Sequence, residues 1–267
     1  MRDEPDPYAA IAAWYDVEHD SLSEDVECYL SLLAAPPSGR ATVFEIGSGT
    51  GRIAAALAVA GHVVTGVEPS AAMRARCAQR LANLPPRVAQ RVRVTAGTAT
   101  EPGLVVKDLQ FDAVLFGLNA FAHLTNLAER HTALVRAHQH LRPGGQLLLD
   151  IDLFGPRRLL DMMGMLSWQG AWPLAGADTA GMQLVHLIAG LPGREPGTLD
   201  VVHMYDSHAP AGAVTRTTAR MTLALLTYGE VTATVARAGF ALATSYGGYD
   251  LAPYEAASPR LIVDARA

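Results

Sequence analysis

The sequence predicts an α/β fold: a doubly wound, seven-stranded and mostly parallel sheet, followed after its fifth strand by a small antiparallel β insertion. Between residues 41 and 151, short apolar segments alternate with helical patterns, and most of these segments are apolar throughout rather than at every second position. That pattern is typical of parallel strands covered by helices on both faces. After Phe154 the pattern changes to segments rich in glycine, proline and alternating residues, which predicts the antiparallel insertion.

The predicted strands of the main sheet are runs of apolar and β-branched residues bounded by turn residues. In chain order they are residues 41–46, 63–67, 92–96, 111–116, 146–151, 241–246 and 261–265. The first connecting helix has Ile53, Leu57 and Ala60 on one face and ends at Gly61, and the second begins at the capping residue Ser70. The strands predicted for the insertion are residues 182–188, 199–205 and 214–225.

The 267 residues are predicted to form a single domain, because half of them are hydrophobic and one α/β core can use them all. Its predicted parts are a helical cap (1–38), a core (39–154 and 223–267) and the insertion (155–222).

Composition excludes several classes of partner. A formal charge of −5 gives no bulk attraction for nucleic acid. Cys28 and Cys77 belong to no paired metal-ligand spacing, so neither a disulfide framework nor a cysteine zinc site is expected. The longest apolar stretch, 54–67, falls short of the ~20 residues that span a membrane. The acidic start carries no secretory signal pattern, so a cytoplasmic protein is expected.

A glycine-rich loop follows the first predicted strand, with the sequence E-I-G-S-G-T-G-R from Glu45 to Arg52. Glycines at a strand-to-helix turn let the backbone turn tightly and approach a ligand closely. The spacing is G-x-G-x-G, and Arg52 stands where a dinucleotide loop has its third glycine, which argues against an NAD-dependent oxidoreductase. No G-K-[ST] follows, so a nucleoside-triphosphate loop is excluded.

Two acids accompany this loop at the ends of the first two strands. Glu68 can accept hydrogen bonds from both hydroxyls of a ribose, and Glu45 can help to neutralise an ammonium group. With Arg52 or backbone amides for a carboxylate, these features fit an adenosine with a cationic tail, as in S-adenosylmethionine. The alternative is that Glu68 belongs only to a helix cap and that Glu45 pairs with an arginine.

An ordered set of motifs resembles the class I S-adenosylmethionine-dependent methyltransferases, and within them the small-molecule group that includes glycine and nucleotide amino-sugar N-methyltransferases. The motifs are Tyr15-Asp16, E-I-G-S-G-T-G-R (45–52), V-T-G-V-E-P-S (64–70), F-D-A-V-L-F-G-L-N-A-F-A-H-L (111–124), L-R-P-G-G-Q-L-L-L-D (141–150) and A-G-F (238–240). The resemblance implies a Rossmann-like methyltransferase fold, S-adenosylmethionine as cofactor and S-adenosylhomocysteine as product.

The resemblance also implies which residues surround the cofactor. They are Tyr15, Glu45, Gly47, Ser48, Gly49, Gly51, Arg52, Glu68, Pro69, Ser70, Met73, Gly97, Thr98, Ala99, Leu118 and Asn119. One position departs from the family pattern, because Gly97 is followed by Thr98 instead of an aspartate that would accept the adenine amino group. This departure motivates an alternative function, a protein that binds the cofactor for non-methylating chemistry or regulation.

The expected reaction is methyl transfer to a small molecule in secondary metabolism, with nitrogen slightly favoured over oxygen as the acceptor atom. Tyr15 and His123 are the candidate catalytic residues, the first in the segment that covers the cofactor in resembling proteins and the second beside the fourth strand. The alternative role for Tyr15 is that of an aromatic side chain packed in a helix, and the alternative role for His123 is that of a helix cap. Asp152 is a weaker candidate, expected instead to cap a helix.

The remaining polar residues predict less. The spacings of His131, His138 and His140 fit no metal site, and alternation along a strand puts His203 on the opposite face from Asp206 and His208. No metal is therefore expected. Arg216 and Arg220 share one strand face, which suits either an anionic substrate group or, preferably, a solvated surface. Free strand edges in the insertion predict a homodimer.

Overall fold

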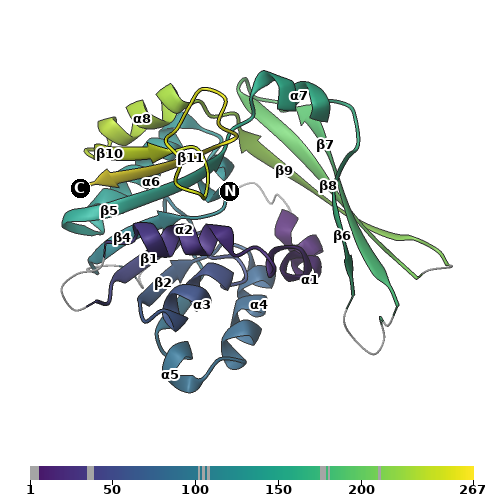
Figure 1. The fold of residues 1–267 in the computed structure, drawn as a ribbon, viewed down its shortest axis with the longest axis horizontal. Helices are drawn as coiled ribbons and strands as arrows, with labels where there is room; N and C mark the ends of the chain where they lie inside the picture. The colour runs from purple at the N-terminus through teal and green to yellow at the C-terminus, as the bar shows by residue number, and fades with distance from the viewer. Residues whose placement is uncertain are drawn as a thin grey trace.

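Two sheets organise the computed structural model, which describes residues 6–34, 39–101, 103, 106, 109–174, 179, 181–209 and 212–267. A seven-stranded sheet has the order β10-β11-β5-β4-β1-β2-β3, and a four-stranded sheet has the order β6-β7-β8-β9. Figure 1 shows the first sheet among its helices and the second extending away from it. The predicted fold class is confirmed. Residues 1–5 and 35–38 of the predicted cap, and 175–178, 180, 210 and 211 of the insertion, lie outside the described residues.

The first five strands of the large sheet run parallel. They are β1 (Thr42–Ile46), β2 (Val63–Val67), β3 (Val92–Thr95), β4 (Phe111–Phe116) and β5 (Leu141–Asp152). At one side β11 (Arg260–Arg266) lies antiparallel to β5, and β10 (Ala241–Tyr246) pairs with β11. The strand order reverses between β1 and β4, and ligands of such sheets bind at the carboxyl ends beside that point.

Helices cover both faces of this sheet, which explains why its strands are apolar throughout. One face packs against α2 (Glu24–Leu32) and α3 (Arg52–Val59), and the other against α6 (Leu127–Gln139) and α8 (Tyr228–Arg237). Successive residues of β1 alternate between these cores, with Val43 toward α3 and Phe44 toward α6. The remaining helices of this half are α4 (Ala71–Ala82), the short α5 (Pro86–Ala89) and the 3-10 helix η2 (Ala120–His123).

The second sheet is the antiparallel insertion. Its strands are β6 (Ser167–Pro173), β7 (Gln183–Pro192), β8 (Thr198–His208) and β9 (Thr215–Ala224), reached from β5 through α7 (Pro156–Met162). The strand β6 was not predicted, because its glycine, proline and exposed Trp168 form no alternating apolar pattern.

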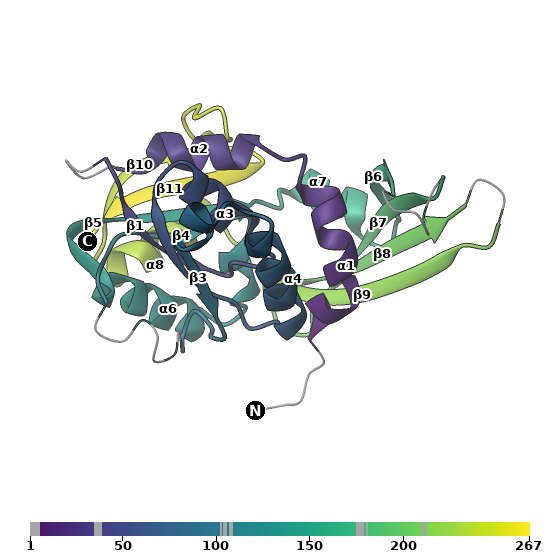
Figure 2. The same ribbon diagram turned by 90° about the horizontal axis from the view of Figure 1, so that it is seen from below.

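The first helix, α1 (Pro7–His19), joins the two halves. It packs against α4 on one side and β9 on the other, and Figure 2 shows it between the two sheets. Ile11 of α1 is buried with Leu184, Tyr205 and Met221 of the small sheet. The carboxyl ends of the parallel strands, α1 and one face of the insertion therefore meet in one region.

None of the described helices is both long and apolar enough to cross a membrane.

Candidate active site

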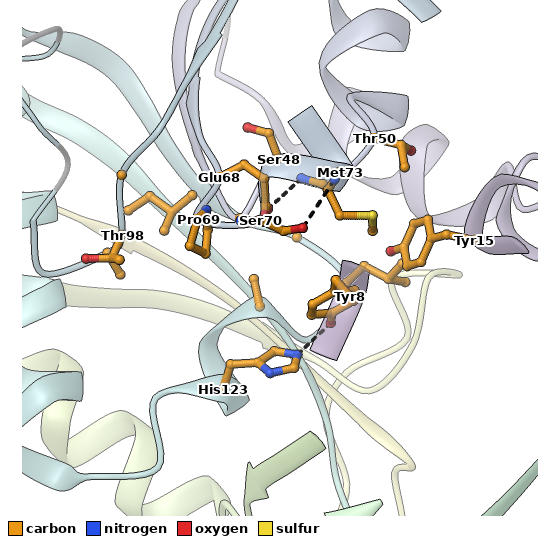
Figure 3. Close-up of a pocket in the computed structure, with 18 of the residues that line it drawn as sticks. Tyr8, Tyr15, Ser48, Thr50, Glu68, Pro69, Ser70, Met73, Thr98 and His123 are labelled. Atoms are coloured by element: carbon orange, nitrogen blue, oxygen red, sulfur yellow. Dashed lines mark hydrogen bonds between the residues drawn. The ribbon is translucent and has the colours of Figure 1, made fainter. Parts of the chain in front are cut away.

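A cavity of about 630 Å³ opens at the carboxyl ends of β1, β2 and β4, where α1 covers it. Figure 3 shows it with Thr98 at one end and Tyr15 at the other. The predicted site residues that line it are Tyr15, Gly47, Ser48, Gly49, Arg52, Glu68, Pro69, Ser70, Met73, Gly97, Thr98, Ala99, Leu118 and His123. The structure thus brings most of the predicted residues to one place.

The glycine loop is built from left-handed backbone conformations that glycine adopts without strain. Gly47 has φ 77° and Gly51 has φ 74°. Gly47 and Gly49 line the cavity, but Gly51 is not among the described lining residues. A Cβ atom on Gly51 would lie 2.5 Å from Cys77 Sγ, so this glycine is required for the packing of the loop against α4.

Glu68 ties the loop to the next helix. Its Oε2 accepts a hydrogen bond from Gly49 N at 2.9 Å, and its Oε1 accepts one from Ser70 N at 2.8 Å. Ser70 Oγ in turn accepts from Met73 N at 3.2 Å, as Figure 3 shows. Burial raises the pKa of Glu68, while the bonds from Ser70 and Gly49 lower it in part. Glu68 therefore does bind the backbone at the start of α4, as the helix-cap alternative held, but it also lines the cavity.

Glu45 is not among the described residues that line the cavity, so its predicted contact with the cofactor stays a prediction. Its side chain is 1% exposed, and its Oε2 has no hydrogen-bond partner in the part of the chain that the structure describes. Burial raises the pKa of Glu45 to about 8, so the carboxyl group is mostly protonated at neutral pH. A neutral carboxyl behind the loop does not neutralise an ammonium group directly.

Arg52 lines the cavity, and its guanidinium group is already paired within the protein. Nη1 donates to Asp25 Oδ1 at 3.1 Å and to the carbonyl oxygen of Leu22 at 2.8 Å, and Nη2 donates to Asp25 Oδ2. Both side chains are buried. The arginine therefore anchors α2 to the start of α3. The sequence offered no sign of Asp25 as its partner.

Tyr8 is a site residue that the sequence analysis missed. Its hydroxyl lies 2.9 Å from His123 Nε2, and its ring meets that of Tyr15 edge to face at 6.3 Å. Figure 3 shows Tyr8 reaching from α1 to the histidine across the cavity. Tyr8 and Tyr15 are two helical turns apart on α1, so a helix-face argument that starts from Tyr15 could have found Tyr8.

Burial sets the protonation states of these three residues. It raises the pKa of Tyr8 and of Tyr15 above the ordinary tyrosine value and lowers the pKa of His123 to about 4. At neutral pH both phenols are protonated and the imidazole is neutral. When His123 Nε2 is the unprotonated nitrogen, Tyr8 donates the hydrogen bond to it.

Residues 44–147 match the model of a protein family described as a methyltransferase domain. Over these residues the chain is similar to a methyltransferase domain.

Solved structures share the fold of nearly the whole chain. The CcbJ methyltransferase from Streptomyces caelestis is 22% identical, with a TM-score of 0.70 over 98% of this chain and 90% of that one. CalS10 from Micromonospora echinaspora, an amino pentose methyltransferase solved with bound S-adenosylmethionine, is 23% identical, with a TM-score of 0.71 over 96% and 95%. DesVI from Streptomyces venezuelae is 17% identical, with a TM-score of 0.74 over 99% and 100%. No curated protein matches the chain.

These findings confirm the predicted resemblance to class I S-adenosylmethionine-dependent methyltransferases. At the end of β4, one of the two predicted residues lies outside the cavity lining. Leu118 lines the cavity, but Asn119 does not belong to the described lining residues. Asn119 Oδ1 instead accepts a hydrogen bond from Asp152 N at 3.1 Å, so this side chain ties η2 to β5.

A buried aspartate supports Leu118 from behind. Asp150 Oδ2 accepts hydrogen bonds from Leu118 N at 3.2 Å and from the hydroxyl of Tyr249 at 3.0 Å, and Tyr29 also donates to it. Arg260 bridges Asp150 and Asp152. Asp152, the weaker catalytic candidate, is therefore part of an ion pair.

At the end of the cavity where adenine is expected, Thr98 is held by its own loop. Its Oγ1 accepts from Glu101 N at 3.0 Å and lies 3.2 Å from Thr100 Oγ1. Thr98 lines the cavity, but its hydroxyl already accepts one hydrogen bond, so it keeps less acceptor capacity than a free aspartate would.

The predicted surface arginines are paired within their sheet. Arg216 donates to both carboxylate oxygens of Asp206 at 2.7 and 2.6 Å, and Arg220 pairs with Asp200. This favours the solvated strand face over an anion site. Within the described residues, no group of histidine, cysteine, aspartate and glutamate side chains is arranged to hold a metal ion.

Proposed function

We propose that this methyltransferase transfers the methyl group of S-adenosylmethionine to a nitrogen of a small-molecule acceptor in secondary metabolism, with oxygen as the second choice of acceptor atom. The observation that carries the proposal is the single cavity that runs from Thr98 past Glu68 and the glycine loop to Tyr8, Tyr15 and His123. Its first part suits an adenosine and its last part presents neutral hydrogen-bonding groups. The amino pentose acceptor named for CalS10 supports nitrogen as the target.

The residues present fit the cofactor. Each oxygen of Glu68 accepts one backbone N–H and keeps a second lone pair, so the carboxylate can also accept from two ribose hydroxyls. Gly47 and Gly49 carry no side chains on the cavity wall, which leaves room for the methionyl part. When bound, the cofactor supplies a methyl group activated by its sulfonium charge.

The residues of α1 and η2 then have to hold the acceptor nitrogen in line with that methyl group. Positioning of this kind supplies ~7–11 kcal/mol of a barrier, whereas a general base contributes roughly 10²–10⁴-fold in rate. With a pKa of about 4, His123 is a weak base and a good hydrogen-bond acceptor. Its neutral state also spares an incoming ammonium group from charge repulsion. We therefore assign Tyr8 and His123 chiefly to orienting the acceptor.

The test is a calorimetric titration with S-adenosylhomocysteine followed by a methyl-transfer assay against amines, amino sugars, phenols and carboxylates. Binding of the product together with a mass gain of one methyl group on an amine is the expected result. Absence of cofactor binding contradicts the proposal. Binding without methylation of any acceptor favours the alternative of non-methylating chemistry or regulation.

A further inference from the structure

Outside the cavity lining, a chain of three polar side chains connects α1 to the insertion. Glu18 Oε1 lies 3.0 Å from His186 Nδ1, and His186 Nε2 lies 3.0 Å from His203 Nδ1. The other oxygen of Glu18 accepts a hydrogen bond from Tyr205 at 2.6 Å. The predicted strand alternation placed His203 correctly away from Asp206 and His208, but it gave no sign of the partners on this face.

The register of the small sheet places all three insertion residues on the face toward α1. His186 of β7 is paired with Tyr205 of β8, and their rings stack at 4.1 Å. His203 lies two residues from Tyr205 along β8, on the same face, opposite Ala219 of β9. β9 packs against η2, the 3-10 helix that carries His123, and His203 lies close enough to His123 for the two imidazoles to interact electrostatically.

The hydrogen bonds constrain the proton positions along this chain. Although burial opposes ionisation, the hydrogen bond from His186 and the nearby imidazoles hold the pKa of Glu18 below its ordinary value. An ionised Glu18 only accepts, so His186 Nδ1 donates to it, and the second bond is assigned with His186 Nε2 as its acceptor. His203 Nδ1 must therefore donate, which leaves His203 Nε2 with a free lone pair.

That lone pair has no hydrogen-bond partner in the described part of the chain, and the His203 side chain is only partly buried. Burial first, and then the neighbouring imidazoles of His186, His123 and His19, lower the pKa of His203 to about 4, so it stays neutral at physiological pH. Glu18 and His186, which is 3% exposed, hold its orientation. The arrangement presents a fixed, uncharged acceptor on the face next to η2.

We infer that the chain Glu18–His186–His203 fixes His203 Nε2 as a hydrogen-bond acceptor for an N–H group of the methyl acceptor, and so makes His203 a specificity-determining residue for amines. This inference rests on the proposed function. An N–H held at His203 turns the nitrogen lone pair in a defined direction, which methyl transfer requires. A phenolate or carboxylate anion offers no proton to this acceptor.

The first test reads the proton positions without activity. Histidine ¹⁵N NMR of the full chain with S-adenosylhomocysteine is expected to show His203 protonated at Nδ1 and unprotonated at Nε2, with assignment by loss of its signals in His203→Asn. Protonation at Nε2 overturns the inference, whatever the enzyme methylates. Replacement of Glu18 by glutamine is expected to change the His203 tautomer populations, which a merely structural contact would not do.

The second test uses the amine that the methyl-transfer assay identifies. Asparagine keeps a donor where His203 Nδ1 lies and removes Nε2, so His203→Asn is expected to raise KM for the amine at least tenfold and to leave KM for S-adenosylmethionine unchanged. The matched control is His208→Asn, a histidine of the same strand on the opposite face. An unchanged amine KM in His203→Asn overturns the inference. Failure of cofactor binding in the wild type would instead count against the proposed function.

Discussion

Single residues at this site perform two tasks at once, and Glu68 shows it most clearly. Its carboxylate organises the backbone of the glycine loop and of α4, and it remains open to a ligand. A glutamine at this position would keep the size of the side chain but replace one acceptor oxygen by a donor. The effect of such a change on ligand binding therefore reports on the acceptor role.

Glu68→Gln is expected to weaken S-adenosylhomocysteine binding at least tenfold. Each hydrogen bond from a ribose hydroxyl to a charged acceptor contributes roughly 1.5–3 kcal/mol, and a tenfold change corresponds to about 1.4 kcal/mol. Calorimetric titration measures the dissociation constant. The control is Glu129→Gln, an exposed acid on α6 away from the cavity. Equal dissociation constants for Glu68→Gln and wild type would contradict the ribose role.

Glu45 predicts a pH dependence of stability. Its folded-state pKa of about 8 lies above its ordinary value of 4.5, so the folded state holds this proton more tightly than the unfolded state. The contribution of Glu45 is complete below pH 4.5 and is lost as the pH rises toward 8. Glu45→Gln removes this titration and is expected to flatten the decline. Urea unfolding of the wild type and of Glu45→Gln at several pH values between 5 and 8 measures the decline in the free energy of unfolding. Parallel declines in the two proteins would refute the raised pKa of Glu45.

At the scale of elements, the ion pair of Arg52 and Asp25 fastens α2 to the beginning of α3. Both charges are buried, and such a pair adds little net stability while it is intact. Removal of one partner lowers the stability strongly, because the partner that remains is a buried and unpaired charge. The arginine that suggested a ligand contact in the sequence is thus a structural link between two helices.

Asp25→Ala is expected to lower the free energy of unfolding by about 3–5 kcal/mol, since it leaves the Arg52 guanidinium buried without its partner. Chemical denaturation measures the difference. Glu24→Ala, which removes the neighbouring exposed acid of the same helical turn, is the control and should cost far less. A similar loss of unfolding free energy in both variants would show that the effect of Asp25→Ala does not come from the ion pair with Arg52.

The elements also show the limits of pattern recognition. The glycine loop and the carboxylates at the strand ends lie within one βαβ unit, and their positions follow from local spacing. Tyr8 and His123 are 115 residues apart in the chain, and Glu18 and His186 are 168 apart. Their contacts depend on how α1 lies between the two sheets, which no local pattern encodes. The strand β6 was missed because it is held by its pairing with β7 and not by its own sequence.

At the scale of the whole molecule, the insertion extends away from the large sheet and ends in two free strand edges, β6 and β9. Unpaired strand edges readily pair with another chain. On β9, Arg216 and Arg220 are engaged by β8, whereas β6 exposes 62% of Trp168. The edge of β6 is therefore the better candidate for contact between two copies.

Light scattering is expected to give twice the 28.3 kDa of the chain, with β6 as the contact. Trp168→Lys places a charge on this edge and should shift the mass toward the monomer. Leu160→Lys, a similarly exposed apolar residue on α7, serves as the control and should leave the dimer intact. A monomeric wild type would refute the prediction.

The sequence by itself determined the α/β class, the order of the seven strands along the chain, and the loop and Glu68 that suit an adenosine, because these features depend on side-chain periodicity and on spacing within one unit. Only the tertiary structure decided that Arg52 pairs with Asp25, that Glu45 lies behind the loop, and that Tyr8 meets His123. Each of these outcomes depends on a partner from a distant element, and burial at that contact, rather than residue type, decides whether a charged or polar group faces the ligand or the core.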